Sequence, residues 1–342
     1  MGDKSSIEWL QGGATWNPIR ARLKEDMVIF PHDGKPKKTI MRGKKGWACV
    51  RISPGCVRCY AARQNEQCGT NPTRAGTGLD YIVSSLSVVE VYLDEKTLLQ
   101  PLRWKRGRLI FPCSMTDWQA DFVPDEFRDR MLAVMAATPQ HTYLSLTKRA
   151  DRQRQYLIDP KLWGRVIAWT RTANLYRAQV VAESAHQQML ERVPLKNLWL
   201  GVSAENQQYW DERVEYLRAT PAALRWVSAE PLLGPIKAPT QLRTVWRTPP
   251  CVKHARYELE CLDCKGMQRI QIPGVDWLVV GGESGPKARP MHPEWARSLR
   301  DRCQGARIPF FFKQWGGVDK KAAGRLLDGR EWSEYPETTG GL

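Results

Sequence analysis

The sequence predicts an α/β fold arranged as a (β/α) barrel, partial or open and TIM-like. Three observations lead to this prediction: short apolar runs recur along the chain, segments with helical spacing separate them, and polar residues follow each run. Strands that alternate with helices form a parallel sheet. In barrels of this kind the chemistry lies at the carboxyl ends of the strands. The polar residues after the runs are therefore the first candidates for a functional site.

The strands and helices follow from local patterns. Phe127, Met131, Leu132 and Met135 have helical spacing and indicate a helix that begins near Pro124. Segments 205–217 and 293–303 also read as helices. The expected strands are apolar runs of four to six residues: 108–112, 141–146, 197–202, 224–227, 275–280 and 308–312.

We expect one barrel domain over residues 1–317, with two insertions. Residues 19–46 are basic and contain Gly and Pro, which interrupt helices and strands, so this segment predicts a loop. Residues 236–274 lie between two expected strands and predict a small Cys/His metal knuckle. Residues 318–342 are polar and glycine-rich, which predicts a loose C-terminal tail.

Composition narrows the possible partners and compartment. Of the 342 residues, 42% are hydrophobic, and the net charge is +16. This balance is ordinary for a globular protein, and no apolar run is long enough to cross a membrane. The first residues lack the apolar segment of a secretory signal, so we expect a cytoplasmic protein without a membrane partner. The positive charge, with basic runs interleaved with aromatic residues at 42–47 and 103–106, predicts a nucleic-acid partner.

The first cysteine cluster predicts a metal site. The chain has nine cysteines, an odd number, and a cytosolic chain with clustered cysteines favours metal binding over disulfides. Cys49, Cys56 and Cys59 follow the spacing C-x6-C-x2-C, and three thiolates can bind three irons of a [4Fe–4S] cluster. A zinc site that recruits a fourth ligand such as Cys68, or unligated thiols, are the alternatives.

Several motifs resemble a family of uncharacterised phage-encoded proteins, over residues 7–317. The family in turn resembles radical SAM enzymes. The motifs are Trp16-Asn17-Pro18, Ser53-Pro54-Gly55-Cys56-x-x-Cys59-Tyr60-Ala61, Leu146-Thr147-Lys148-Arg149, Glu230-Pro231-Leu232-Leu233-Gly234-Pro235, Gly281-Gly282-Glu283-Ser284-Gly285 and Phe310-Phe311-Phe312-Lys313-Gln314-Trp315-Gly316.

The resemblance implies a (β/α) barrel in which Cys49, Cys56 and Cys59 hold a [4Fe–4S] cluster. The open iron of such a cluster chelates S-adenosylmethionine, and an electron donor such as flavodoxin or ferredoxin reduces the cluster. The resemblance extends distantly to spore photoproduct lyase, a DNA-repair enzyme. The loop between the first two cysteines is three residues longer here than the commonest radical SAM spacing, and Arg58 precedes Cys59.

The resemblance also implies a cofactor pocket at the strand ends. In the superfamily, the residues after the first strand bind the amino group, and a later strand end holds the ribose. Each carboxylate has the alternative of pairing with Lys or Arg inside the barrel mouth. The expected cofactor-binding residues are Ser114, Thr116 and Asp117 for the amino group, Lys148 for a carboxylate or phosphate, Ser203 and Glu205 for the ribose, and Glu230, Gly282, Glu283, Lys313 and Gln314 around the ring.

The second cysteine cluster has zinc-like spacing. Cys251, His254, Cys261 and Cys264 form two chelating pairs within a short insertion. Such a segment has few apolar residues, so a bound metal would supply its folding energy. A second Fe–S cluster and adventitious cysteines are the alternatives.

The leading hypothesis is a radical SAM-like enzyme that abstracts hydrogen from a nucleic acid or a base within one, for modification or repair. No catalytic residue is assigned. A non-catalytic nucleic-acid-binding protein with structural zinc, and a protein whose Fe–S cluster is only structural, are the alternatives.

Overall fold

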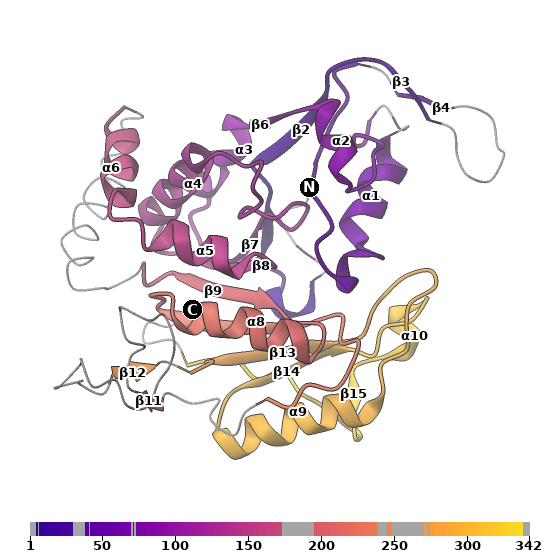
Figure 1. The fold of residues 1–342 in the computed structure, drawn as a ribbon, viewed down its shortest axis with the longest axis vertical. Coiled ribbons are helices and arrows are strands. Elements are labelled where there is room, and N and C mark those ends of the chain that lie inside the picture. Colours follow the sequence, from indigo (N-terminus) through magenta and orange to yellow (C-terminus); the bar gives the residue numbers. More distant parts are fainter. Residues whose placement is uncertain are drawn as a thin grey trace, which may run out of the picture.

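The chain forms a curled sheet of seven parallel strands flanked by helices (Figure 1). The computed structural model describes residues 5, 7–29, 38–40, 42–69, 71, 73–172, 195–238, 245–247, 270–272 and 274–337. The sheet order is β1-β7-β8-β9-β10-β13-β14, so the strands follow one another in chain order. β1 and β14 form its two edges, and the sheet is therefore a half-barrel.

Every strand pair of this sheet is parallel, with β1 beside β7 and β13 beside β14 at the two ends. All six expected strands are present, and Ala14–Trp16 adds a seventh that was not expected. The seven strands are β1 (Ala14–Trp16), β7 (Leu109–Pro112), β8 (Thr142–Thr147), β9 (Leu198–Ser203), β10 (Leu224–Ala229), β13 (Trp277–Gly281) and β14 (Phe310–Gln314).

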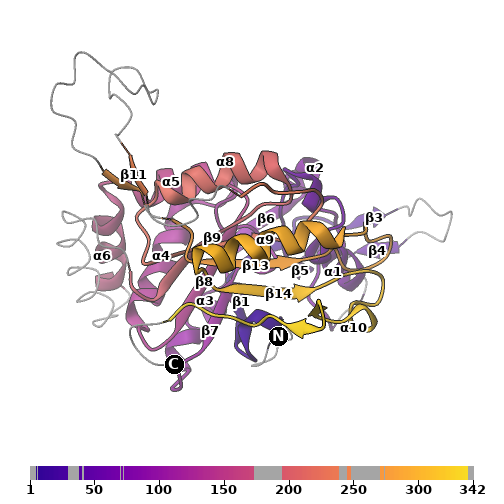
Figure 2. The same ribbon diagram turned by 90° about the horizontal axis from the view of Figure 1, so that it is seen from below.

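Most of the helices pack on the convex face of the sheet (Figures 1 and 2), whereas the helix Tyr60–Gly69 lies beyond the carboxyl ends of the strands. Asn206 caps α8, because its side chain accepts a hydrogen bond from the Tyr209 amide at 3.2 Å. α9 begins with Pro293 in its first turn, where the missing amide hydrogen is not needed. The main helices are α1 (Tyr60–Gly69), α4 (Asp125–Ala137), α5 (Ala150–Leu157), α6 (Leu162–Thr172), α8 (Gln207–Arg218) and α9 (Pro293–Ala306).

The concave face of the sheet is filled by aromatic side chains toward its amino end. Trp226, Trp277 and Phe311 point inward from neighbouring strands, since alternate residues of a strand share a face. The short 3-10 helix Glu8–Leu10 inserts Trp9 between them, with its ring centroid 5.1 Å from those of both Trp226 and Phe111. We call this group of aromatic side chains the aromatic plug, and it fills the amino end of the concave face.

The segment 19–46, which we expected to be a basic loop, contains strands. β2 (Ile19–Leu23) pairs antiparallel with β5 (Lys45–Gly46) and with β6 (Val89–Leu93), and β3 (Met27–Ile29) pairs with β4 (Lys38–Ile40). β2 alternates buried and half-exposed residues, and Ala21 and Leu23 pack into a small core. The charged residues of this strand conceal its period-two pattern in the sequence.

The C-terminal segment also differs from the expected loose tail. It contains α10 (Lys320–Ala323), β15 (Leu326–Leu327) and β16 (Arg330–Glu331), and it then runs antiparallel along the free edge of β14. The Phe312 amide donates to the Trp332 carbonyl at 2.9 Å, and Leu327 and Trp332 are buried. Two apolar side chains within a polar stretch are thus enough to cover an edge strand.

Two strands and two short helices lie outside the elements described above. In the second insertion, β11 (Val245–Arg247) and β12 (Ile270–Ile272) pair antiparallel. The remaining helices, α2 (Val83–Ser87) and α3 (Glu95–Leu98), flank β6. No helix in the described ranges has the length and apolar character that a membrane crossing requires.

Candidate functional site

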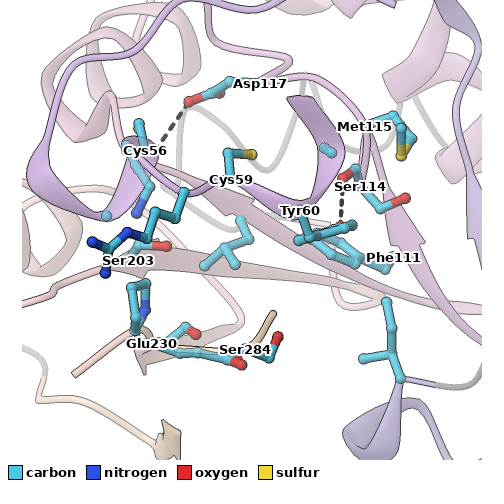
Figure 3. Close-up of a pocket in the computed structure, with 18 of the residues that line it drawn as sticks. Cys56, Cys59, Tyr60, Phe111, Ser114, Met115, Asp117, Ser203, Glu230 and Ser284 are labelled. Carbon is cyan, nitrogen blue, oxygen red and sulfur yellow. Dashed lines mark hydrogen bonds between the residues drawn. The ribbon is translucent and has the colours of Figure 1, made fainter. Parts of the chain in front are cut away.

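A cavity of about 700 Å³ opens at the carboxyl end of the half-barrel. Its walls come from the strand ends and from the segment between β5 and α1, which we call the cysteine loop (residues 48–59). Figure 3 shows Cys56 and Cys59 around this space, together with Asp117, Ser203 and Glu230. The residues expected in the site that line the cavity are Cys49, Cys56, Cys59, Ser114, Thr116, Asp117, Lys148, Ser203, Glu230, Gly282, Glu283, Lys313 and Gln314.

The cysteine loop brings three thiols to one cavity. Cys56 ends the 3-10 turn Pro54–Cys56, and the Cys59 amide donates to the Cys56 carbonyl at 3.3 Å. Cys49 and Cys59 pack against a small buried cluster that includes Trp47 and Tyr81. Burial raises the pKa of the Cys49 thiol to about 12 and also raises the pKa of Cys59. Both thiols are therefore protonated at neutral pH without a metal.

The described part of the chain contains no group of three or more His, Cys, Asp or Glu side chains arranged to hold a metal ion. The second cysteine cluster, with Cys251, His254, Cys261 and Cys264, lies outside the described residues. The zinc ligands expected there therefore remain a sequence prediction.

The Asp117 carboxylate accepts hydrogen bonds from several neighbouring residues. Its carboxylate accepts from the Thr147 hydroxyl at 2.7 Å, from the Lys148 amide at 3.1 Å and from the Arg149 guanidinium at 3.0 Å. Arg149 also donates to the Val50 carbonyl at 3.3 Å. Through Arg149, the strand ends of β7 and β8 are thus tied to the cysteine loop.

Glu205 is completely buried behind the cavity and does not line it. The Ser53 hydroxyl donates to Oε1 at 2.6 Å, the Lys148 ammonium contacts the same oxygen, and Arg213 donates to Oε2 at 3.0 Å. Burial alone would raise the pKa of Glu205, but Lys148 and Arg213 lower it below its usual value. Glu205 is therefore a buried, paired carboxylate.

Glu283 is a second buried carboxylate that is linked to the cysteine loop. Arg289 donates to Glu283 Oε2 from its backbone amide and from Nε, both at 2.9 Å, and contacts Oε1 as well. Arg58 of the cysteine loop also donates to Oε2, at 3.3 Å. Burial would raise the pKa of Glu283, but the hydrogen bonds from Arg289 and Arg58 lower it.

Glu230 and Lys313 face the cavity as a pair. Lys313 Nζ lies 2.7 and 2.9 Å from the two carboxylate oxygens, and Gln314 donates to Oε1 at 3.3 Å. A Cβ on Gly281 would lie 3.2 Å from the Glu230 carboxyl carbon, so glycine gives this side chain its space. Unlike Glu205, both groups are partly exposed to the cavity.

Several lining residues are not among the sequence predictions. Cys113 follows β7 with a positive φ of 56°, and it is a fourth, buried thiol on the cavity wall. Tyr60 donates to the Ser114 carbonyl at 2.5 Å (Figure 3), and Tyr81 donates to the Met115 carbonyl at the same distance. Tyr60 directly follows Cys59, which is a sequence signal for it, whereas Tyr81 lies far from the cysteine loop along the chain and carries no such signal.

Residues 44–336 match the model of a family described as "Protein of unknown function (DUF5131)". No curated protein and no solved structure matches the chain.

Proposed function

The chain belongs to the DUF5131 family, and we propose that it is a radical SAM-type enzyme that acts on a nucleic acid. One observation carries this proposal: Cys49, Cys56 and Cys59 line the same cavity as the polar residues at the ends of the parallel strands. Cofactor chemistry in barrels of parallel strands takes place at this end. The aromatic plug closes the other end of the half-barrel.

The cysteine loop has the donor chemistry that a [4Fe–4S] cluster needs. Soft thiolates select Fe–S clusters, and each thiolate of a cluster binds a different iron. The three sulfurs therefore need to surround a space rather than meet at one ion, and here they border a cavity of about 700 Å³. Cys49, Cys56 and Cys59 would hold such a cluster, and a bound cluster reduced by an external electron donor would supply the electron that cleaves S-adenosylmethionine into methionine and a 5′-deoxyadenosyl radical able to abstract hydrogen from a substrate.

The partly exposed polar groups of the cavity suit the polar ends of S-adenosylmethionine. The amino group of the cofactor needs hydrogen-bond acceptors, which the Glu230 carboxylate offers. The carboxylate of the cofactor needs a cation, and the Lys313 ammonium lies beside Glu230. Ser203 and Ser114 add hydroxyls to the wall, and Gly282 allows close approach of the backbone. These residues would bind and orient the cofactor.

The charge of the chain supports a polyanionic substrate. The net charge is +16, and Arg58 and Arg63 line the cavity near Tyr60, a residue that is 45% exposed. Cations that pair with phosphates beside an aromatic ring that stacks on a base are typical of nucleic-acid sites.

The test is anaerobic reconstitution with iron and sulfide, followed by incubation with S-adenosylmethionine and a reductant. We expect about four irons per chain, a brown colour and release of 5′-deoxyadenosine. The Cys56→Ala variant should lose the colour and the product. The matched control is Cys303→Ala, since Cys303 is buried in α9 away from the cavity. A wild-type protein that stays colourless, or binds iron without releasing 5′-deoxyadenosine, would contradict the proposal.

A further inference from the structure

Three carboxylates at the strand ends hold the cysteine loop from different sides. Asp117 reaches the Val50 carbonyl through Arg149, and Glu205 accepts directly from Ser53. Glu283 accepts from Arg58 of the loop. These contacts join residues that are far apart in the sequence, so the sheet fixes the position of the loop.

Glu205 makes the closest of these contacts. Its side chain is fully buried, and its two oxygens are taken by Ser53, Lys148 and Arg213. The backbone of the turn also lies against it, since a Cβ on Gly55 would be 2.5 Å from Glu205 Oε1. A carboxylate enclosed in this way cannot also accept a hydrogen bond from a ribose in the cavity.

Glu283 supports the other side of the same turn. Arg289, which Glu283 holds through both oxygens, donates from Nη2 to the Pro54 carbonyl at 2.9 Å. The carbonyl of Pro54 and the hydroxyl of Ser53 are therefore fixed by different strands, β13 and β9 respectively. The turn between Cys49 and Cys56 is held at two adjacent residues.

We propose that Glu205 and Glu283 are positioning residues for the cysteine loop, and not ligands of S-adenosylmethionine. The inference rests on the proposed function in that the loop is taken to bind the cluster. Glu205 and Glu283 keep Cys56 and Cys59 at the cavity wall, while Glu230 and Lys313 remain available to the cofactor.

The first experiment measures amide hydrogen exchange of the cysteine loop in Glu205→Gln and Ser53→Ala, on the protein as purified. Ser53→Ala removes one hydrogen bond and leaves the Lys148 and Arg213 pairs intact, so it should fold even if Glu205→Gln does not. We expect exchange in residues 50–59 to be about tenfold faster in Ser53→Ala, with the strands unchanged. Ser53→Thr keeps the hydroxyl and should restore slow exchange.

The control is Ser87→Ala, because the exposed Ser87 hydroxyl only donates to the Ser84 carbonyl at 2.8 Å. Unchanged exchange in the loop of both test variants would overturn the positioning role. This readout needs no metal, so it can fail or succeed independently of the proposed function.

The second experiment measures iron release to a chelator and cofactor affinity in the reconstituted protein. Glu205→Gln and Glu283→Gln should release iron several-fold faster than wild type, while the affinity of the remaining loaded protein for S-adenosylmethionine stays within about twofold. A weakened cofactor affinity with unchanged iron release would show that these acids are cofactor ligands and would overturn the inference. A wild-type protein that binds no iron would contradict the proposed function instead.

Discussion

Gly55 packs tightly against Glu205 within the cysteine loop. A Cβ added there would lie 2.5 Å from Glu205 Oε1 and 2.6 Å from its Cγ, and Glu205 cannot move without breaking its buried ion pairs. The Gly55→Ala substitution should therefore displace the turn and destabilise the protein by about 1–3 kcal/mol. Urea denaturation measures this change.

The control for Gly55→Ala is Gly164→Ala. Gly164 lies in α6, is exposed, and has no heavy atom within 4 Å of an added Cβ. Alanine is the better helix former, so this variant should gain about 0.5–1 kcal/mol. If both variants had the same stability as wild type, the tight contact between Gly55 and Glu205 would be refuted.

Individual site residues could be predicted only where they follow a strand. Asp117, Lys148, Glu230 and Glu283 each lie within about five residues after the end of a strand, so the parallel sheet predicts that they meet at one edge. Partners that lie in the cysteine loop carry no such signal. Ser53, for example, is 152 positions from Glu205, and only the folded chain reveals that the two are bonded.

At the scale of elements, Asp328 ties the β15–β16 turn to α9. Arg297 donates to Asp328 Oδ1 at 2.8 Å, Arg300 contacts Oδ2, and their hydrogen bonds lower the pKa of Asp328 to about 2. A carboxylate with a depressed folded-state pKa contributes stability above its unfolded pKa of about 4. That contribution is lost as the pH falls toward about 2.

Asp328→Asn should therefore lose less stability than wild type when the pH is lowered from about 5 to about 2. Asparagine tolerates the positive φ of 55° at this position, so the backbone is not strained. Chemical denaturation across this pH range measures the difference between the two curves. Parallel curves would mean that the arginine pair does not stabilise the folded state.

Trp332 fixes the C-terminal segment on β14. The residue is buried, its ring packs edge-on against Phe310 with a centroid separation of 5.9 Å, and its Nε1 donates to the Leu327 carbonyl at 3.2 Å. Trp332→Ala should cost about 3–5 kcal/mol and leave the β14 edge uncovered. Thermal unfolding and light scattering should report a lower Tm and earlier aggregation. A variant as stable and as soluble as wild type would refute this role.

The strands of the half-barrel were the predictable elements, since strands buried on both faces read as continuous apolar runs. β1 was missed because it has only three residues, although Trp16 and Asn17 at its end belong to a motif that the sequence displays. The small sheet of β2, β5 and β6 was missed because Arg20 and Arg22 alternate with its buried residues. Short or charged strands are recognised only through their partners.

At the scale of the whole molecule, the net charge of +16 predicts that nucleic-acid binding depends on the salt concentration. Cations that pair with phosphates release counterions, so the logarithm of affinity falls linearly with that of the salt concentration. We expect the wild-type chain to bind a single-stranded oligonucleotide at low salt, and to lose at least about tenfold in affinity between about 50 and about 200 mM salt.

Fluorescence anisotropy with labelled DNA and RNA of equal length measures this dependence, and Arg63→Ala tests whether the cavity mouth takes part. Arg63 lines the cavity beside Gly285. If it contacts a phosphate, replacing it should make the slope of the logarithm of affinity against the logarithm of salt concentration shallower by about one. The Lys24→Ala variant is the control, since Lys24 lies beyond β2 and donates to the Ser87 carbonyl. Binding that is absent, or that does not depend on salt, would contradict a nucleic-acid substrate. Equal slopes for Arg63→Ala and wild type would instead place the nucleic acid away from the cavity.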